Sequence, residues 1–120
     1  MIIRIHSILL FCRDLNKTAK FYKQIGFEVE KGGDTLRIIF NDFRLTFIDE
    51  KNAIIKNDPV AKKGVGMFIY FEVEEVDTFY QELIEKKIKT SSQPKSWPWG
   101  KREFALKDPD EYKLIFFNNI

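Results

Sequence analysis

The chain has 120 residues, 20 Lys and Arg against 18 Asp and Glu, and 44% hydrophobic residues that include twelve Phe. This length supports one compact domain, and the apolar content excludes a disordered chain. The net charge of +2 gives no reason to expect nucleic acid as a partner. A single cysteine, Cys12, excludes an internal disulfide and favours a reducing, cytoplasmic location. No apolar run reaches membrane-spanning length, so we expect no membrane association.

The first half of the chain predicts a strand, a helix and three short strands. Residues 2–12 are rich in Ile, Leu and Phe, which is typical of a buried strand. Asp14 then stands at a helix N-cap position, apolar residues follow at helical spacing, and Gly26 ends the helix. We expect short strands at 27–31, 35–40 and 43–48, separated by Gly-Gly and Asn-Asp turns.

The second half predicts the same elements in the same order. Residues 51–66 carry Lys, Asn, Pro and Gly, so we interpret them as a connector between a first module (about 1–50) and a second (about 67–120). Apolar residues at i, i+3, i+4, i+7 and i+8 from Val76 indicate an amphipathic helix. The strands are expected at 67–73, near 88–92, at 102–107 and at 112–118.

The two halves also share short sequences. The segment DLNKTAKFY at 14–22 has its counterpart in EEVDTFY at 74–80, and FRLTFI at 43–48 has its counterpart in YKLIFF at 112–117. Each half therefore reads β-α-β-β-β. These units predict a single α+β domain of two βαβββ modules, in which a curved mixed sheet forms a cup with helices on its outer face. The groove between the modules is the expected ligand site.

The opening HSILLFCRDLNKTAKFYKQIGFEVE resembles the first module of the vicinal oxygen chelate superfamily, and SWPWGKREFALKDPDEYKLIFF resembles its last hairpin. This superfamily includes glyoxalase I, bleomycin-resistance proteins, fosfomycin-resistance enzymes and extradiol dioxygenases. The resemblance implies the glyoxalase/bleomycin resistance fold over nearly the whole chain. Its last hairpin usually closes with Asp-Pro-Asp-Gly, and Glu111 stands here in place of that glycine.

Metal-dependent members place one His or Glu ligand on each of four strands, and the resemblance puts those positions at Ser7, Thr46, Phe68 and Ile115. None of these side chains is a typical ligand for a first-row metal. We therefore expect no metal and no cofactor. In an alternative hypothesis, a one-residue slip of the first strand turns His6 into a ligand, assisted by Glu72 or Glu103; such a slip would exchange the two faces of that strand.

When Ser7, Thr46, Phe68 and Ile115 point toward the ligand, strand alternation separates an apolar face under the helices from a mixed face on the ligand side. The apolar set is Ile8, Leu10, Cys12, Phe43, Leu45, Phe47, Ile69, Phe71, Leu114 and Phe116. The predicted ligand-binding residues combine aromatic walls with a few polar groups: Phe11, Arg44, Thr46, Phe68, Tyr70, Glu72, Trp97, Trp99 and Ile115. The two tryptophans flank Pro98 in a loop at the expected rim. Alternatively, these aromatic side chains close the sheet on itself or on a partner chain.

These features predict a metal-independent protein that binds and sequesters a small, partly aromatic molecule, similar to the bleomycin-resistance branch. We assign no catalytic residues, and the resemblance implies a homodimer. Two hypotheses remain beside this one. The first is a divalent-metal-dependent lyase, transferase or dioxygenase with atypical ligands such as His6. The second is an interaction module whose cup is filled.

Overall fold

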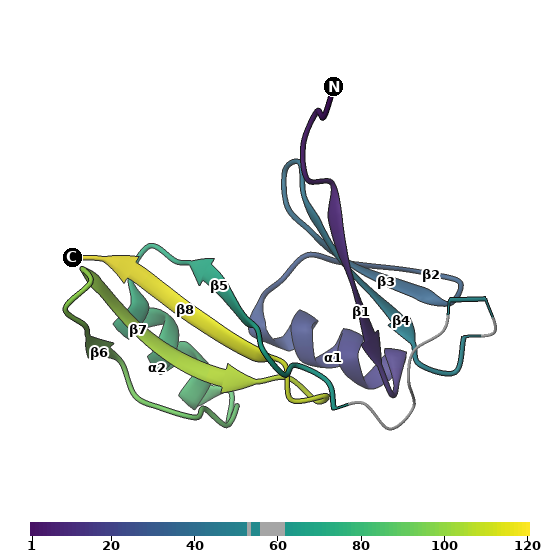
Figure 1. The fold of residues 1–120 in the computed structure, drawn as a ribbon. Coiled ribbons are helices and arrows are strands. Elements are labelled where there is room, and N and C mark those ends of the chain that lie inside the picture. The colour runs from purple at the N-terminus through teal and green to yellow at the C-terminus, as the bar shows by residue number, and fades with distance from the viewer. Residues whose placement is uncertain (53, 56–61) are drawn as a thin grey trace. The chain divides into compact units, whose positions relative to one another are not determined.

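The computed structural model describes residues 1–52, 54–55 and 62–120, and the chain divides into two compact units, Met1–Lys63 and Gly64–Ile120 (Figure 1). Unit one contains β1 (Ser7–Cys12), α1 (Leu15–Ile25), β2 (Val29–Gly32), β3 (Thr35–Ile39) and β4 (Arg44–Asp49). Unit two contains β5 (Phe68–Glu72), α2 (Val76–Glu85), β6 (Lys95–Ser96), β7 (Lys101–Lys107) and β8 (Lys113–Asn119). The predicted α+β class, with two βαβββ modules, is confirmed. Of the predicted connector, residues 53 and 56–61 lie outside the described residues.

Unit one is a four-stranded mixed sheet with strand order β1-β4-β3-β2. β1 runs parallel to β4, while the other pairs are antiparallel. Helix α1 packs on one face, where the ring of Tyr22 lies 5.1 Å from that of Phe47. Leu10 and Leu45, which the sequence placed under the helix, are buried with Phe47 as predicted. Burial of this apolar face is the main force that holds α1 to the sheet.

Unit two repeats this arrangement with strand order β5-β8-β7-β6 and a parallel β5–β8 pair. Helix α2 contributes Phe79, whose ring lies 4.9 Å from Phe116 and 6.2 Å from Phe104. The first turn of α2 has no side-chain cap of its own. Instead, the Val76 amide donates to Oδ1 of Asn118 on β8 at 2.7 Å, which satisfies one amide that a helix start leaves unpaired.

The predicted ends of the first helix are confirmed. Oδ1 of Asp14 accepts a hydrogen bond from the Lys17 amide at 3.0 Å, as an N-cap does. Gly26 has φ +119°, and its amide donates to the carbonyls of Tyr22 and Lys23. A glycine takes this left-handed conformation without the steric cost of a side chain. Neither helix in the described part of the chain is long and apolar enough to cross a membrane.

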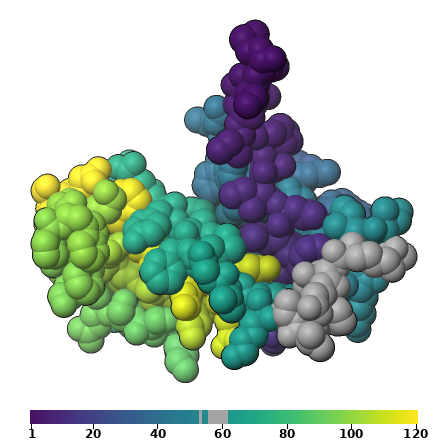
Figure 2. Space-filling model, in the orientation of Figure 1, coloured from purple at the N-terminus to yellow at the C-terminus, as the bar shows by residue number. Residues whose placement is uncertain are grey.

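The predicted strand at 2–12 is wrong at its N-terminal end, because β1 begins only at Ser7. β4 begins at Arg44, which pairs with Ser7, so no ladder partner reaches the residues before it. One hydrogen bond extends the pairing, from the Arg44 amide to the His6 carbonyl. Ile3 and the other apolar residues of this segment are exposed, and Figure 2 shows the segment projecting from unit one.

The predicted strand near 88–92 is also wrong, since β6 is the two-residue strand Lys95–Ser96. The earlier residues still reach β7: the Ser91 amide donates to the Ala105 carbonyl, and the Ala105 amide donates to Oγ of Ser92. Pro94 then interrupts the edge, because it has no amide hydrogen and restricts the residue before it. Regular pairing starts only after this proline.

The turn between β7 and β8 is held by Asp108. Its Oδ1 accepts from the amides of Asp110 at 2.8 Å and Tyr112 at 3.0 Å. Glu111 lies in this turn with φ +70°, the left-handed region that the family's glycine would occupy at little cost. The Asp108 cap therefore holds Glu111 in a conformation that L-residues disfavour.

We predict that Glu111→Gly raises the free energy of unfolding by about 0.5–1 kcal/mol, because removal of left-handed strain outweighs the added freedom of the unfolded chain. Urea denaturation measures the change. Glu111→Ala is the matched control, since it removes the same side chain but keeps a Cβ. An equal gain in both variants would show that the side chain, and not the backbone, carries the effect.

Candidate functional site

Each sheet has one face under its helix and one face opposite it, which we call the helix-distal face. Residues paired across neighbouring strands share a face, and every second residue of a strand returns to it. In unit two, Phe104 and Phe116 face α2. The residues that alternate with Phe104 along β7, and with Phe116 along β8, therefore lie on the helix-distal face. The same alternation separates the two faces in unit one.

Three predicted site residues lie on the helix-distal face of unit one: Phe11, Arg44 and Thr46. Thr46 pairs with Leu9, and Arg44 pairs with Ser7, so they share this face with Phe11. Nη1 of Arg44 donates to the carbonyls of Phe40 at 2.7 Å and Phe43 at 3.1 Å. These bonds close the loop between β3 and β4, which gives Arg44 a structural contact beside its predicted role.

Four predicted residues lie together on the helix-distal face of unit two: Phe68, Tyr70, Glu72 and Ile115. Tyr70 pairs with Ile115, and its ring meets that of Phe117 edge-on at 5.9 Å. Phe68 is 57% exposed and Tyr70 47%, while Ile115 is buried beneath this aromatic surface. Glu72 is exposed at the end of β5, opposite Phe117. The structure thus brings these four onto one largely apolar surface.

The two predicted tryptophans lie in the tight turn between β6 and β7. The Trp97 amide donates to the Lys101 carbonyl at 2.8 Å, so Trp97 continues the β6–β7 pairing onto the helix-distal face. Its indole stacks on that of Trp99, with ring centroids 4.9 Å apart and planes 8° from parallel. Nζ of Lys95 lies 4.1 Å from the Trp97 ring centroid. Trp97 therefore already has two partners, and Trp99, 57% exposed, offers the accessible aromatic surface.

Sequence reasoning left several residues of this face out of the ligand-binding set, among them Lys95, Lys101 and Glu103. Lys95 pairs with Glu103 across β6–β7, and Glu103 pairs with Phe117 across β7–β8. Nζ of Lys101 lies 5.1 Å from the Phe117 ring centroid. Alternation along β7 puts Lys101 and Glu103 on the face of Phe117, and this is the sequence signal that identifies them.

The four positions that correspond to the family's metal ligands do not fit a divalent ion. Ser7 and Thr46 lie on the helix-distal face of unit one, and Phe68 and Ile115 on that of unit two. Neither a phenyl nor a butyl group can donate to a metal, and a hydroxyl is a weak ligand. The described residues contain no group of three or more His, Cys, Asp or Glu placed to hold an ion. The one-residue slip that would turn His6 into a ligand is not found. It would move Leu10 and Cys12 to the ligand side of the sheet, and both are buried.

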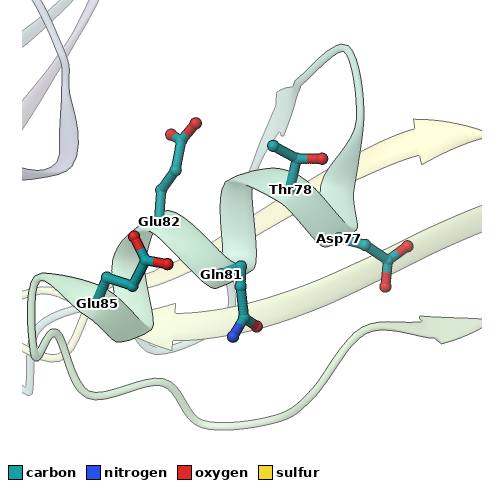
Figure 3. A pocket seen from close by; sticks show the side chains of 5 residues that line it. All are labelled: Asp77, Thr78, Gln81, Glu82 and Glu85. Carbon is teal, nitrogen blue, oxygen red and sulfur yellow. The ribbon is translucent and has the colours of Figure 1, made fainter.

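The described part of the chain also has an acidic groove of about 480 Å³ along α2, on the other side of unit two's sheet from the helix-distal face. Figure 3 shows the five polar side chains that line it: Asp77, Thr78, Gln81, Glu82 and Glu85. Three of the five side chains are acidic, and one of these, Asp77, accepts a hydrogen bond from Arg102.

The chain belongs to the Glyoxalase/Bleomycin resistance protein/Dioxygenase superfamily, whose family model matches residues 4–116. No match is found among curated protein sequences. A glyoxalase/bleomycin resistance protein/dioxygenase from Nocardioides superposes with a TM-score of 0.82 at 18% identity, covering 100% of this chain and 85% of that one. A virulence protein from Salmonella typhimurium gives 0.80 at 17% identity, covering 100% and 99%.

A third structure is the bleomycin resistance determinant encoded on the transposon Tn5, with a TM-score of 0.71, 25% identity and 98% coverage of both chains. These likenesses agree with the fold of each unit. The family contains both enzymes and resistance proteins by its description, so membership alone does not assign a reaction.

The hairpin that carries the tryptophans is tied to α2 by Arg102. Its Nε and Nη2 donate to the two carboxylate oxygens of Asp77 at 2.8 and 2.9 Å, and its Nη1 donates to Oγ of Ser96 at 3.2 Å. The hydrogen bonds from Arg102 hold the pKa of the Asp77 carboxyl below its usual range. One guanidinium thus joins the helix, β6 and β7.

We predict that this contact makes stability depend on acid pH. Because the folded state lowers the pKa of Asp77, its contribution is fully present above the unfolded-state pKa, about 4, and is lost as pH falls through the folded-state value. Wild type should therefore be more stable than Asp77→Asn at pH 7, and the difference should shrink as the pH falls below about 4.

Denaturation of both proteins between neutral and strongly acid pH measures this difference. Asp42→Asn, at an exposed turn position, is the control for general loss of one negative charge. A gap between wild type and Asp77→Asn that stays constant down to the lowest pH would contradict the assignment.

Proposed function

We propose that this protein binds and sequesters a small, partly aromatic molecule without a metal ion, in the manner that the name of the bleomycin resistance neighbour suggests. The observation that carries the proposal is the cluster of exposed aromatic side chains on the helix-distal face of unit two. Phe68, Tyr70 and Trp99 are each about half exposed or more, although the core of the unit is already well filled by other rings.

This surface has the make-up of a small-molecule site. Aromatic and aliphatic walls supply affinity through burial, and a few polar groups orient the ligand. Trp99 offers an indole that its stacking on Trp97 holds in place, so a planar ligand meets a preformed surface and orders little on binding. On this surface Glu72 is the proposed orienting group and Ile115 an apolar one. On the helix-distal face of unit one, Arg44 and Thr46 are the proposed orienting groups and Phe11 the apolar one.

We also propose a homodimer that acts in the cytoplasm. Apolar side chains are exposed on several parts of the described chain, among them the N-terminal segment before β1 and the helix-distal face of unit two. Large exposed apolar surfaces mark sites that a ligand or a second chain covers. The absence of a second cysteine fits a reducing compartment.

We predict that Trp99→Ala weakens ligand binding roughly three- to tenfold, because one aromatic stacking contact is lost. The probes are bleomycin and the neutral planar compound naphthalene-2-carboxamide, titrated while the change in tryptophan fluorescence is followed. The thermal midpoint of the unliganded protein should not change, because Trp99 is more than half exposed and contributes little to the core.

Trp99→Phe is the matched control, since it keeps an aromatic ring in the turn and should retain most of the affinity. Equal affinity of wild type and Trp99→Ala would remove this turn from the site. No binding of either probe to wild type would contradict the proposed function itself.

The homodimer is tested by sedimentation velocity over a range of protein concentrations. We expect a single species of twice the chain mass, because covering the exposed apolar side chains removes them from water. A species of the mass of one chain at every concentration would contradict the homodimer. The exposed apolar side chains would then be available to a ligand only.

A further inference from the structure

Glu103 on β7 has one buried carboxylate oxygen that the described residues leave without a hydrogen-bond partner. The residue is 8% exposed, and its Oε2 has no hydrogen-bond partner among the described residues. A carboxylate oxygen removed from water without a hydrogen bond is costly for a protein to retain. Such a group marks a place where an incoming donor would be bound strongly.

The neighbours of Glu103 explain both its burial and its lack of a partner. Lys95 lies opposite it on β6, and Phe117 lies opposite it on β8. The ammonium of Lys95 lies over the ring of Trp97, and the ammonium of Lys101 lies over the ring of Phe117. Both nearby cations are thus directed at aromatic rings, and no ion pair to Glu103 is found in the described part of the chain.

We propose that Glu103 is the recognition residue for a cationic nitrogen group, such as an amidinium or ammonium, on a planar aromatic ligand. The inference rests on the proposed function, ligand binding on the helix-distal face of unit two, and names the chemical class of that ligand. The ligand's N–H groups donate to the Glu103 carboxylate, while its ring packs on the aromatic side chains beside it, Phe117, Tyr70 and the tryptophan pair.

A cation fits this position better than a neutral or anionic group. An ionised carboxylate only accepts hydrogen bonds, so an anionic ligand would meet repulsion there. A neutral donor satisfies the oxygen but leaves the buried charge uncompensated, whereas a cation does both through a charge-assisted bond. A planar cation can also lie against the exposed indole of Trp99, as Lys95 lies over Trp97.

The experiment compares three compounds with one ring system: naphthalene-2-carboxamidine, which is cationic, the neutral naphthalene-2-carboxamide, and the anionic naphthalene-2-carboxylate. Each is titrated into the full chain, and amide resonances in ¹⁵N-correlated spectra give the affinity and the residues affected. Wild type is compared with Glu103→Gln, which keeps the shape and removes the charge. Glu82→Gln is the matched control, since it removes one charge from the acidic groove on α2.

Wild type should bind the amidine roughly tenfold or more tightly than the amide, with shifts on β7 and β8 around Glu103. Glu103→Gln should lose this preference but bind the amide as wild type does, and Glu82→Gln should keep it. The thermal midpoint of unliganded Glu103→Gln should be equal to or above that of wild type, because an uncompensated buried charge is removed. A residue with only a structural role would lower the midpoint.

Several results would overturn the inference. An unchanged amidine preference in Glu103→Gln, a loss of preference in Glu82→Gln, or tighter binding of the carboxylate would each do so. If wild type binds the amide and the amidine equally, the inference fails while the proposed function stands. If wild type binds none of the three compounds and does not bind bleomycin, both fail.

Discussion

In each unit the first strand pairs in parallel with the last strand. The register of this pairing determines which face of the sheet each residue of the first strand occupies. In unit two, Tyr70 pairs with Ile115, and Phe71 pairs with Phe116. Since side chains alternate between faces, this register sends one pair to the helix-distal face and the next pair under α2. A shift of β5 by one residue along β8 would place Glu72 beneath the helix and expose Phe71. The composition of both faces therefore rests on a few backbone hydrogen bonds.

The face under α2 shows why the aromatic residues of the other face are available. Phe116 stacks with Phe71 at 5.3 Å and with Phe104 at 5.5 Å, and Phe79 of the helix completes this cluster. These rings are mutually packed and close the core of unit two. Phe68 and Tyr70 are not needed for that purpose, so their presence on the opposite face favours a role in binding over a role in folding.

Local sequence signals predicted the elements well wherever the deciding interaction is local. The Asp14 cap, the Gly26 stop and the alternation through Leu45 and Phe47 depend on residues close in sequence, and all are found. The predicted strand at 2–12 is wrong over residues 2–6, and the one near 88–92 is wrong throughout, because a strand needs a partner that lies elsewhere in the chain. The first lies beyond the start of β4, and the second meets Pro94 before regular pairing begins.

The candidate site shows the same limit. The strand alternation that groups Phe68, Tyr70 and Glu72 with Ile115 could be read from the sequence, because β5 and β8 repeat the pattern of unit one. The sequence suggested Glu103 only as a possible helper of His6, and its burial could not be predicted in the same way. Glu103 is buried between Lys95 and Phe117. That burial depends on the two-residue strand β6 and on the orientation of the Lys95 and Lys101 side chains. Only tertiary structure contains this information.

The order of strands has a consequence for how the chain folds. Short loops join β7 to β8 and β3 to β4, so these antiparallel pairs can form early. The first strand of each unit pairs with the last strand, which is distant in sequence. Closing so long a loop is entropically costly, and contacts distant in sequence slow folding. We therefore expect each sheet to gain its first strand last. In unit two that strand, β5, carries Phe68 and Tyr70, so the aromatic helix-distal surface should be completed in the final step of folding.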